Sequence, residues 1–272
     1  MVFTICYTLN AIRSCMTPLI KLKNISKHFV EDGNHGTIAL ADIDMEIFAG
    51  EIFVFVGPSG SGKSTLLRIM SGLEKDFKGE ITYQEETRQR DFSFVFQQFA
   101  LLPWLTVAEN IGIGLVARDI SPYHIKERVN KELKRFGLER FGNEYPRELS
   151  GGMRQRVGIA RAFATDPKVI FMDEPFSELD SFTAEELRKE LLHIWHNSEW
   201  SEEAHHAQSR PTIVMVTHVI EEAIELADRI AVLTPRPAKI ERIVVNNLPR
   251  PRELRSHAFY TLEDELYRLI KP

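Results

Sequence analysis

The stretch Gly57-Pro58-Ser59-Gly60-Ser61-Gly62-Lys63-Ser64-Thr65 decides the fold of this chain. It follows the apolar run 52–56, which is typical of a strand buried on both faces. It leads into a helical pattern over residues 66–70, which Gly72 is expected to end. A strand, a glycine-rich turn and a helix in this order are the context in which a P-loop binds phosphate.

The loop residues predict that the chain binds a nucleoside triphosphate. The glycines let successive backbone N–H groups turn inward around a phosphate, and the helix N-terminus adds its positive end. Lys63 can then reach the β- and γ-phosphates, while the Ser64 hydroxyl can ligate Mg²⁺. The alternative is a glycine turn that binds no ligand. That alternative does not explain why Lys63 and Ser64 follow the turn.

Composition narrows the class of protein. The chain has 272 residues, of which 43% are apolar and 27% charged, as in ordinary soluble globular proteins. Its net charge of −5 provides no basic footprint, which argues against a nucleic-acid partner. No apolar run reaches the length that spans a bilayer, so a membrane role is expected to come through a partner.

Residues 1–15 are predicted to lie outside the fold, as a disordered tail or the product of an upstream start. The reason is that Met16 stands just before the first strand pattern, where a natural start is expected. The two cysteines, Cys6 and Cys15, both fall in this stretch, so no disulfide framework is expected. A cytoplasmic protein is the plain expectation.

Residues 16–272 are predicted to form an α/β fold that contains an all-helical insertion. Strand patterns cover residues 19–48, 79–83, 92–96, 169–172 and 212–216. Residues 98–148 are mostly helical, with a helix start at Ser121-Pro122 and a helix end at Gly137. With the helix that follows Ser150, the insertion extends over about residues 98–160.

Polar residues follow the buried strands at their carboxyl ends, the edge where open α/β sheets bind ligands. Asp173 is expected to anchor Mg²⁺, and Glu174 to polarise a water for attack on the γ-phosphate. His218, after another strand, is expected to contact the γ-phosphate. The alternatives are a helix cap or surface pair for the carboxylates and a structural role for the histidine.

The stretch Leu149-Ser150-Gly151-Gly152-Met153-Arg154-Gln155-Arg156 discriminates best between nucleotide-binding classes. Ser150 and the two glycines open a second helix whose N-terminus suits an anion. Because the P-loop already holds the phosphates of its own site, this second motif is expected to act in trans, on a nucleotide held by another copy.

From about Leu19 to the C-terminal helix, the chain resembles the ATP-binding subunits of ABC transporters. The resemblance rests on the P-loop, Gln97, the Leu149–Met153 signature, Asp173-Glu174, the loop 177–180 and His218, which occur in family order. It implies an antiparallel β subdomain beside a RecA-like core. It also implies a head-to-tail pair, of this chain or with a similar ATPase subunit, that holds two ATP molecules.

The resemblance implies ATP and Mg²⁺ as cofactors and a role for each matching residue. The implied residues are, for ATP binding, Phe29, Gly57, Pro58, Ser59, Gly60, Ser61, Gly62, Lys63, Ser64, Thr65 and Gln97; for ATP binding in trans, Ser150, Gly151, Gly152 and Asp180; for Mg²⁺, Ser64, Gln97 and Asp173; for catalysis, Glu174, His218 and Lys63. From the residues alone, Phe29 suits a core position as well as stacking on adenine.

Two positions depart from the family pattern. Met153 replaces a common glutamine, which removes a hydrogen-bonding side chain and leaves the Ser-Gly-Gly anion site intact. Glu178 stands where alanine is commoner, which puts a carboxylate near the implied ATP sites.

The stretch Phe99–Val107 looks like the one found in nitrate, sulfonate and taurine importers. That subgroup implies an ATP-hydrolysing import subunit for a small anionic solute, peripheral on the cytoplasmic face of the plasma membrane. Its implied partners are membrane permease subunits and, indirectly, an external solute-binding protein, with no nucleic acid. An ABC exporter ATPase or a non-transport ABC ATPase is the alternative.

Three further predictions concern surfaces. An apolar groove for a permease helix, or part of the insertion's own core, is expected from Phe99, Leu101, Leu102 and Trp104. The C-terminal pattern predicts an amphipathic helix packed on the sheet through Phe259, Leu262, Leu266 and Leu269, with a solvated face at Arg250, Arg252 and Arg255. A metal site is not expected at His193, His196, His205 and His206.

Overall fold

The computed structural model describes residues 17–29, 36–85, 87–196 and 210–271. The chain folds into two compact units, Met1–Arg88 with Val216–Pro272 and Gln89–Met215, called here the first and second units. The predicted N-terminal tail, both cysteines, His205 and His206 lie outside the described residues.

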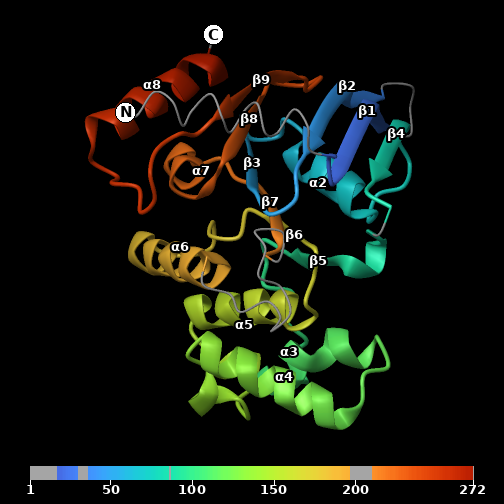
Figure 1. The fold of residues 1–272 in the computed structure, drawn as a ribbon, viewed down its shortest axis with the longest axis vertical. Coiled ribbons are helices and arrows are strands. Elements are labelled where there is room, and N and C mark those ends of the chain that lie inside the picture. Colours follow the sequence, from blue (N-terminus) through green and yellow to red (C-terminus); the bar gives the residue numbers. More distant parts are fainter. Residues whose placement is uncertain (1–16, 30–35, 86, 197–209, 272) are drawn as a thin grey trace. The chain divides into compact units, whose positions relative to one another are not determined.

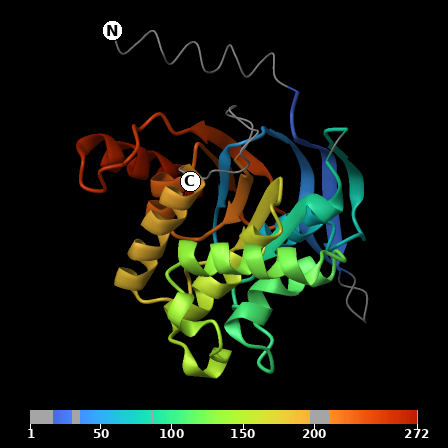
Figure 2. The same ribbon diagram turned by 60° about the horizontal axis from the view of Figure 1, so that its bottom comes forward.

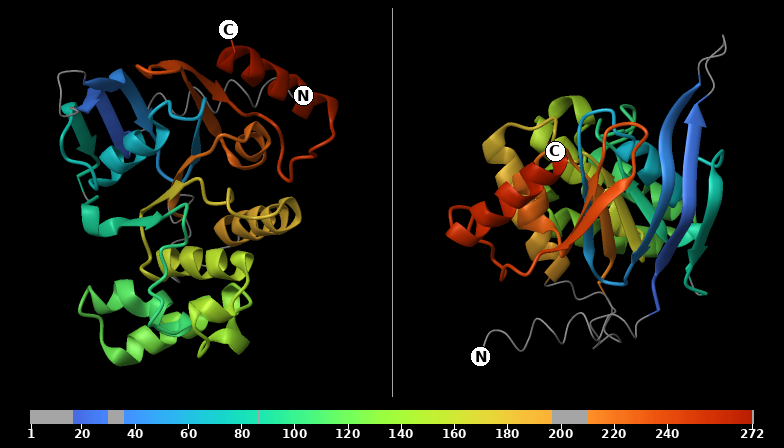
Figure 3. Two further views of the ribbon diagram at one scale, coloured as in Figure 1. Left: turned by 180° about the vertical axis from the view of Figure 1, so that it is seen from behind. Right: turned by 90° about the horizontal axis from the view of Figure 1, so that it is seen from above.

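The first unit contains an antiparallel sheet in the order β2-β1-β4. Its strands are β1 (Ile20–Phe29), β2 (Thr37–Ile47) and β4 (Lys78–Tyr83), which run side by side in Figure 3. In β2, Ile43, Met45 and Ile47 are buried while Asp42 and Asp44 are exposed, so the predicted alternation is confirmed.

The first unit also contains the strand that leads into the P-loop. Its other elements are β3 (Ile52–Val56), β8 (Arg229–Leu233), β9 (Ile240–Val245), α2 (Lys63–Ser71), α7 (Ile220–Leu226) and α8 (His257–Ile270). β3 pairs in parallel with β8, and β8 pairs antiparallel with β9. All five residues of β3 are buried, as the apolar run predicts.

The C-terminal helix α8 packs against α7 and β8, and Figure 1 shows α8 beside α7. Phe259 and Leu266 are fully buried, whereas Leu262 and Leu269 are half-buried at the margin of the contact. The predicted amphipathic helix is confirmed. It packs on a helix, α7, as well as on a strand of the sheet, β8.

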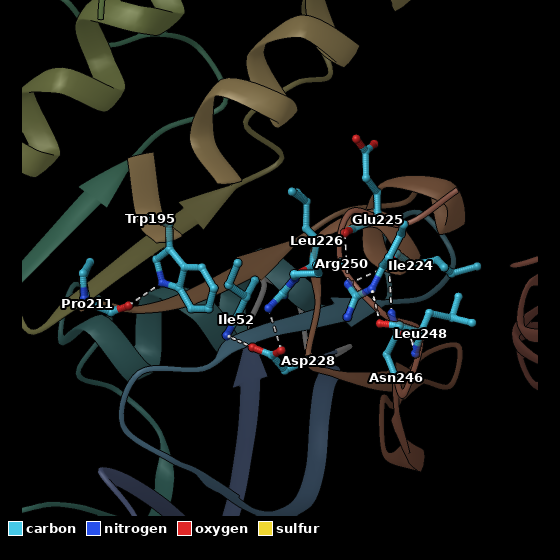
Figure 4. Close-up of polar contacts among 11 residues, drawn as sticks. Ile52, Trp195, Pro211, Ile224, Glu225, Leu226, Asp228, Asn246, Leu248 and Arg250 are labelled. Carbon is cyan, nitrogen blue, oxygen red and sulfur yellow. Dashed lines mark hydrogen bonds and ion pairs between the residues drawn. The ribbon is translucent and has the colours of Figure 1, made fainter. Parts of the chain in front are cut away.

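The predicted solvated arginine face is wrong for Arg250 and Arg252, and only Arg255 is exposed. Arg252 donates to the carbonyl oxygens of α7, and Arg250 pairs with Asp228 at 2.9 Å (Figure 4). The physical reason is that the last carbonyls of a helix have no partner within the helix and need donors from elsewhere.

The second unit has its own strands, with β6 lying between β5 and β7. They are β5 (Phe92–Val95), β6 (Val169–Asp173) and β7 (Thr212–Val216), whose last residue already belongs to the first unit. β5 and β6 pair in parallel, and β6 and β7 are buried along their whole length. β5 ends at Val95, so Phe96 lies beyond the strand predicted for it.

Helices make up most of the second unit, and Figure 2 shows α3, α4 and α5 gathered together. Its helical elements are η1 (Gln89–Asp91), α3 (Val107–Val116), α4 (Pro122–Arg135), η2 (Glu139–Phe141), η3 (Pro146–Glu148), α5 (Gly151–Ala164) and α6 (Ser181–His196). Ser121 caps α4 with Pro122 at its start, and Gly137 follows α4 with φ of +62°, as predicted.

The first helix of the second unit's insertion begins at Val107, and residues 98–106 before it are not helical. The Asn110 side-chain amide donates to the carbonyls of Leu102, Leu105 and Thr106, and its oxygen accepts from the Leu102 N–H. A buried asparagine therefore holds residues 102–106 in an irregular turn, which the helical pattern of the sequence does not reveal.

Across the described residues, no helix combines the length and apolar character that crossing a membrane requires. The same residues contain no cluster of three or more potential metal ligands, and His193 and His196 are exposed on the last turn of α6.

Candidate functional site

The P-loop passes so close to its neighbours that two of its positions accept only glycine. A Cβ at Gly57 would lie 2.8 Å from the carbonyl oxygen of Leu233, and one at Gly62 would lie 3.0 Å from Leu40. Gly62 also has φ of +95°, in the left-handed region. The glycines therefore set both the turn and its close packing between strands of the first unit.

The start of α2 and the Lys63 ammonium together suit an anion. Gly62 caps the helix without a side-chain hydrogen bond, so the first turn offers backbone N–H groups. Lys63 is only 4% exposed, and its Nζ donates to the carbonyls of Gly57 and Pro58 at 3.0 Å each. The cation is thus held inside the loop, at the place where phosphate oxygens would collect.

Ser61 provides a second sign that the loop is built for a ligand. Its hydroxyl is buried and forms no hydrogen bond with any described residue. A buried polar atom without a partner is costly unless something else satisfies it. Triphosphate oxygens would supply acceptors at this loop, so the residues fit the predicted nucleotide.

His218 lies beside the P-loop within the first unit. The Thr217 N–H donates to the carbonyl of Phe55 in β3 at 3.1 Å, which fixes the chain one residue before the histidine. His218, Pro58 and Ser59 help to line a pocket of about 400 Å³. The fold thus brings the P-loop and the predicted γ-phosphate contact to one cavity, although His218 lies 159 residues after Ser59 in the sequence.

Phe29 ends β1 with its side chain 39% exposed. Lys27 Nζ lies 4.9 Å from the centre of its ring. The ring is therefore at the surface and not in the core, which leaves a face for stacking.

The second unit supplies the predicted carboxylates at the end of β6. Asp173 is buried as the last residue of the strand, and Glu174 follows with φ of +44°. The Ser177 hydroxyl and N–H both donate to the Glu174 carbonyl, at 2.9 and 3.3 Å, and hold this turn. A non-glycine residue in the left-handed region is strained, and such strain gathers at functional sites.

The residues predicted to act in trans come together within the second unit. Ser150 caps α5 by accepting from the Met153 N–H, and a Cβ added at Gly152 would lie 2.4 Å from Thr183 Cγ2. Thr183 donates its N–H and hydroxyl to the Asp180 carboxylate at 3.0 and 2.7 Å. These bonds lower the pKa of Asp180 and keep it ionised beside the start of α5.

Gln97 is exposed after β5, and the chain that follows it is tied to α5. Arg161 donates to the carbonyls of Ala100 and Phe99 at 2.7 and 3.1 Å, and Arg154 lies 5.2 Å over the Phe99 ring. Arg161 could not be predicted as a tether from the sequence, because an arginine in a helix normally indicates a solvated position.

The apolar groove of the second unit is displaced from its predicted position. Trp104 is 68% exposed, but Phe99, Leu101 and Leu102 are half-buried and do not line the cavity. The groove is a cavity of about 990 Å³ between α3 and α4, lined among others by Leu105, Ala108, Gly112, Ile113, Val116, Ile125 and Val129. Gly112 lets α3 and α4 approach closely beside this cavity, since a Cβ there would lie 3.1 Å from Val129.

Comparison with known proteins decides the family. Residues 40–177, which include the P-loop, the signature and the β6 carboxylates, match the family model described as ABC transporter. The chain belongs to the ABC transporter family. It is therefore an ABC ATPase, which binds ATP and hydrolyses it to drive transport, and the predicted resemblance is confirmed.

Relatives of this ABC ATPase match it over nearly their whole length. An uncharacterised ABC transporter ATP-binding protein of Methanocaldococcus jannaschii is 39% identical, over 95% of this chain and 94% of the relative. An aliphatic sulfonates import ATP-binding protein of Bacillus cereus is 39% identical, over 91% and 94%. A nitrate import ATP-binding protein of Synechocystis is 39% identical, over 90% and 89%.

Solved ABC cassettes share the fold. A dimeric structure of an ATP-binding cassette in a post-hydrolysis state, bound to ADP and Pi, is 35% identical with a TM-score of 0.70. The match covers 84% of this chain and 99% of that one. The predicted fold, an ABC ATPase with an antiparallel sheet and helices, is confirmed.

Proposed function

We propose that this ABC ATPase powers the import of a small anionic solute of the nitrate, sulfonate or taurine type. The observation that carries the proposal is the set of import relatives. Besides the sulfonate and nitrate subunits, a probable sulfate/thiosulfate import ATP-binding protein of Chlorella vulgaris is 45% identical over 79% of this chain. The solutes that these names share are small oxyanions.

The phosphate site of the proposal is the P-loop. Its backbone N–H groups and the Lys63 ammonium hold the β- and γ-phosphates, and Phe29 stacks on the adenine. Lys63 is already confined inside the loop, so binding exchanges its two carbonyl acceptors for phosphate oxygens. The exposed ring of Phe29 supports the stacking role.

The hydrolytic residues of the proposal come from strand ends. Glu174 accepts a proton from the attacking water, and His218 contacts the γ-phosphate and orients that water. The strained backbone of Glu174 and the position of His218 beside the P-loop support these roles.

We assign the Mg²⁺ ligands to Ser64, Gln97 and Asp173. A hydroxyl, an amide oxygen and a carboxylate are the oxygen ligands that Mg²⁺ prefers. The ion, when bound, neutralises charge on the β- and γ-phosphates.

Two chains complete the proposed site. Ser150, Gly151, Gly152 and Asp180 act on the ATP of a second copy, head to tail. The packing of Gly152 on Thr183 and the bonds from Thr183 to Asp180 hold these residues as one rigid group, which supports a shared role. Two solved cassettes similar to this chain are described as dimeric.

The proposed membrane partner is a permease whose helix docks in the groove between α3 and α4. The groove is open to solvent and mainly apolar, as a helix-binding surface requires. The chain would then act at the cytoplasmic face of the membrane, and an external solute-binding protein would deliver the anion to the permease.

The experiment compares Glu174→Gln with the parent and with Glu186→Gln, an exposed carboxylate on α6, as the matched control. We expect Glu174→Gln to lower the ATPase rate by at least about a hundredfold and to remain a dimer in Mg-ATP by light scattering. Glu186→Gln is expected to keep the parental rate. Parental activity in Glu174→Gln would refute the assignment of the base.

The import direction is tested in the source cells. Cells that carry Glu174→Gln in place of the parent are expected to lose uptake of one labelled anion among nitrate, sulfate and taurine. Unchanged uptake of all three, with altered efflux of any of them, would contradict the import proposal.

A further inference from the structure

Helix α7 connects the predicted γ-phosphate contact to the C-terminal segment of the chain. The helix has seven residues, Ile220–Leu226, and begins two positions after His218. A helix of this length is about 10 Å long and behaves as one rigid piece. A restraint on its far end therefore acts on the backbone that carries His218.

The near end of α7 is held by a short hydrogen-bond chain. The Thr217 hydroxyl accepts from the Val219 N–H at 3.1 Å and donates to Glu222 at 2.7 Å. Thr217 and Glu222 are both buried, and Thr217 also donates its N–H to Phe55 of β3. The hydrogen bonds of Thr217 thus fix the backbone next to His218 between β3 and the first turn of α7.

The far end of α7 is held by residues 246–252, which precede α8. Arg252 donates to the carbonyls of Ile224 and Glu225 at 2.9 Å each, and also donates to Leu248. The Asn246 amide donates to Ile224 at 2.8 Å, as the dashed lines of Figure 4 show.

Arg250 links the C-terminal end of α7 to β3, the strand that leads into the P-loop. It donates to the Leu226 carbonyl and pairs with Asp228 at 2.9 Å. The other oxygen of Asp228 accepts from the N–H of Ile52, the first residue of β3, at 2.9 Å. Two guanidinium groups therefore satisfy three successive helix-end carbonyls and connect them to β3.

The charge of these groups suits their position. Cations at a helix C-terminus are favoured by the helix dipole, and bonds from a charged donor are about twice as strong as neutral ones. Burial lowers the pKa of Arg252 to about 10, so its guanidinium remains protonated at neutral pH. Arg252 therefore donates its hydrogen bonds to α7 as a charged group at physiological pH.

The end of α8 reaches the same cavity as His218. Tyr267, Ile270 and Lys271 line the pocket of about 400 Å³ together with His218 and the P-loop. Phe259 and Leu266 fix α8 by full burial. Residues 246–252 bind the C-terminal end of α7, and α8, which follows them, lines the cavity next to the N-terminal end of α7.

We propose that Arg252 is a positioning residue for His218, which it acts on through α7, and that Arg250 assists it. This inference rests on the proposed role of His218 at the γ-phosphate. Arg252 touches no substrate. By holding the last turn of α7, it fixes where the histidine at the other end stands relative to the P-loop.

A double-mutant cycle tests this positioning role. The variants are Arg252→Ala, His218→Ala and the double variant, with Arg255→Ala, an exposed neighbour, as the matched control. We expect Arg252→Ala to lower kcat about tenfold while KM for ATP stays within about twofold, because the P-loop still binds the phosphates. Adding Arg252→Ala to His218→Ala is expected to change kcat by less than about twofold, since the two act as one unit.

Arg252→Lys guards against a folding defect. Lysine keeps the charge but has one nitrogen, so it cannot bind the carbonyls of α7 and that of Leu248 from two separate nitrogens as Arg252 does. Its kcat is therefore expected to lie between those of the parent and Arg252→Ala. Hydrogen exchange of the α7 amides is expected to follow the same order, whereas α2 is expected to be unchanged.

The outcomes separate the inference from the proposed function. Equal losses from Arg252→Ala in the parent and in His218→Ala would show that Arg252 acts independently of the histidine and would overturn the inference alone. A parental rate in Arg252→Ala would also overturn it. A parental rate in His218→Ala would refute the proposed role of the histidine itself, and the inference with it.

Discussion

Gly152, at the start of α5, packs closely against the side chain of Thr183. The Cβ that alanine would add at position 152 would lie 2.4 Å from Thr183 Cγ2, too close for any real pair. The Thr183 hydroxyl on the same side chain donates to Asp180. One threonine therefore packs against Gly152 with its methyl group and orients Asp180 with its hydroxyl.

Gly152→Ala is expected to reduce stability by about 1–3 kcal/mol, as overpacking does, and to lose ATP-dependent dimerisation. The measurements are urea unfolding and light scattering in Mg-ATP. Gly158→Ala in the same helix is the matched control, because its Cβ would lie 3.5 Å from its nearest neighbour, an ordinary contact. Thr183→Ser removes the clashing methyl and keeps the hydroxyl, so it is expected to rescue Gly152→Ala; failure to rescue would contradict this account.

Helix α4 carries a buried charge that is only partly compensated. Glu132 is 1% exposed, and its Oε1 lies 3.5 Å from Arg135 Nη1. Its Oε2 is buried without a hydrogen-bond partner among the described residues. Burial raises the pKa of Glu132, because the interior disfavours the charged form more than the nearby arginine favours it.

This shift gives Glu132→Gln a pH-dependent effect on stability. The folded pKa is raised, so ionisation of Glu132 costs stability as pH rises from its unfolded pKa of about 4.3 through the folded value. Glu132→Gln removes that cost and is expected to be more stable than the parent at pH 8, with the gain vanishing near pH 4. Urea unfolding at both pH values checks it, with the exposed Glu127→Gln of the same helix as control; a gain independent of pH would contradict the cause given.

At the scale of the whole molecule, the proposed site belongs to no single chain. The first unit supplies the P-loop and His218, and the second supplies a signature group that faces another copy in the proposed dimer. Two chains that are inactive for different reasons can then complement each other, because a head-to-tail pair combines the P-loop of one with the signature of the other.

Lys63→Ala and Ser150→Phe are each expected to abolish ATP hydrolysis as separate proteins. Half of the dimers in an equimolar mixture contain one of each, and each such dimer keeps one complete site. The mixture is therefore expected to recover up to about a quarter of the parental ATPase rate. No recovery, in a mixture shown by mass spectrometry to contain mixed dimers, would contradict a composite site.

Features that depend on neighbouring residues could be predicted from local patterns in the sequence. The strand, loop and helix around Lys63, the helix start at Ser121-Pro122 and the helix end at Gly137 all follow from backbone preferences over a few positions. The family motifs lie within such segments, so they and the fold class could be predicted. The roles of the site residues stay predictions, since the fold shows where they lie and not what they bind.

Contacts between residues far apart in sequence could not be predicted and become visible in the folded chain. Arg252 and Arg250 looked like a solvated face, yet they bind the carbonyls of α7 more than twenty residues earlier. Arg161 binds a segment about sixty residues earlier, and Asn110 binds the irregular turn that precedes α3. The physical reason is the same in each case. The carbonyl groups of a helix end or a turn need hydrogen-bond donors. Tertiary packing determines which segment supplies those donors, so a local sequence pattern cannot predict it.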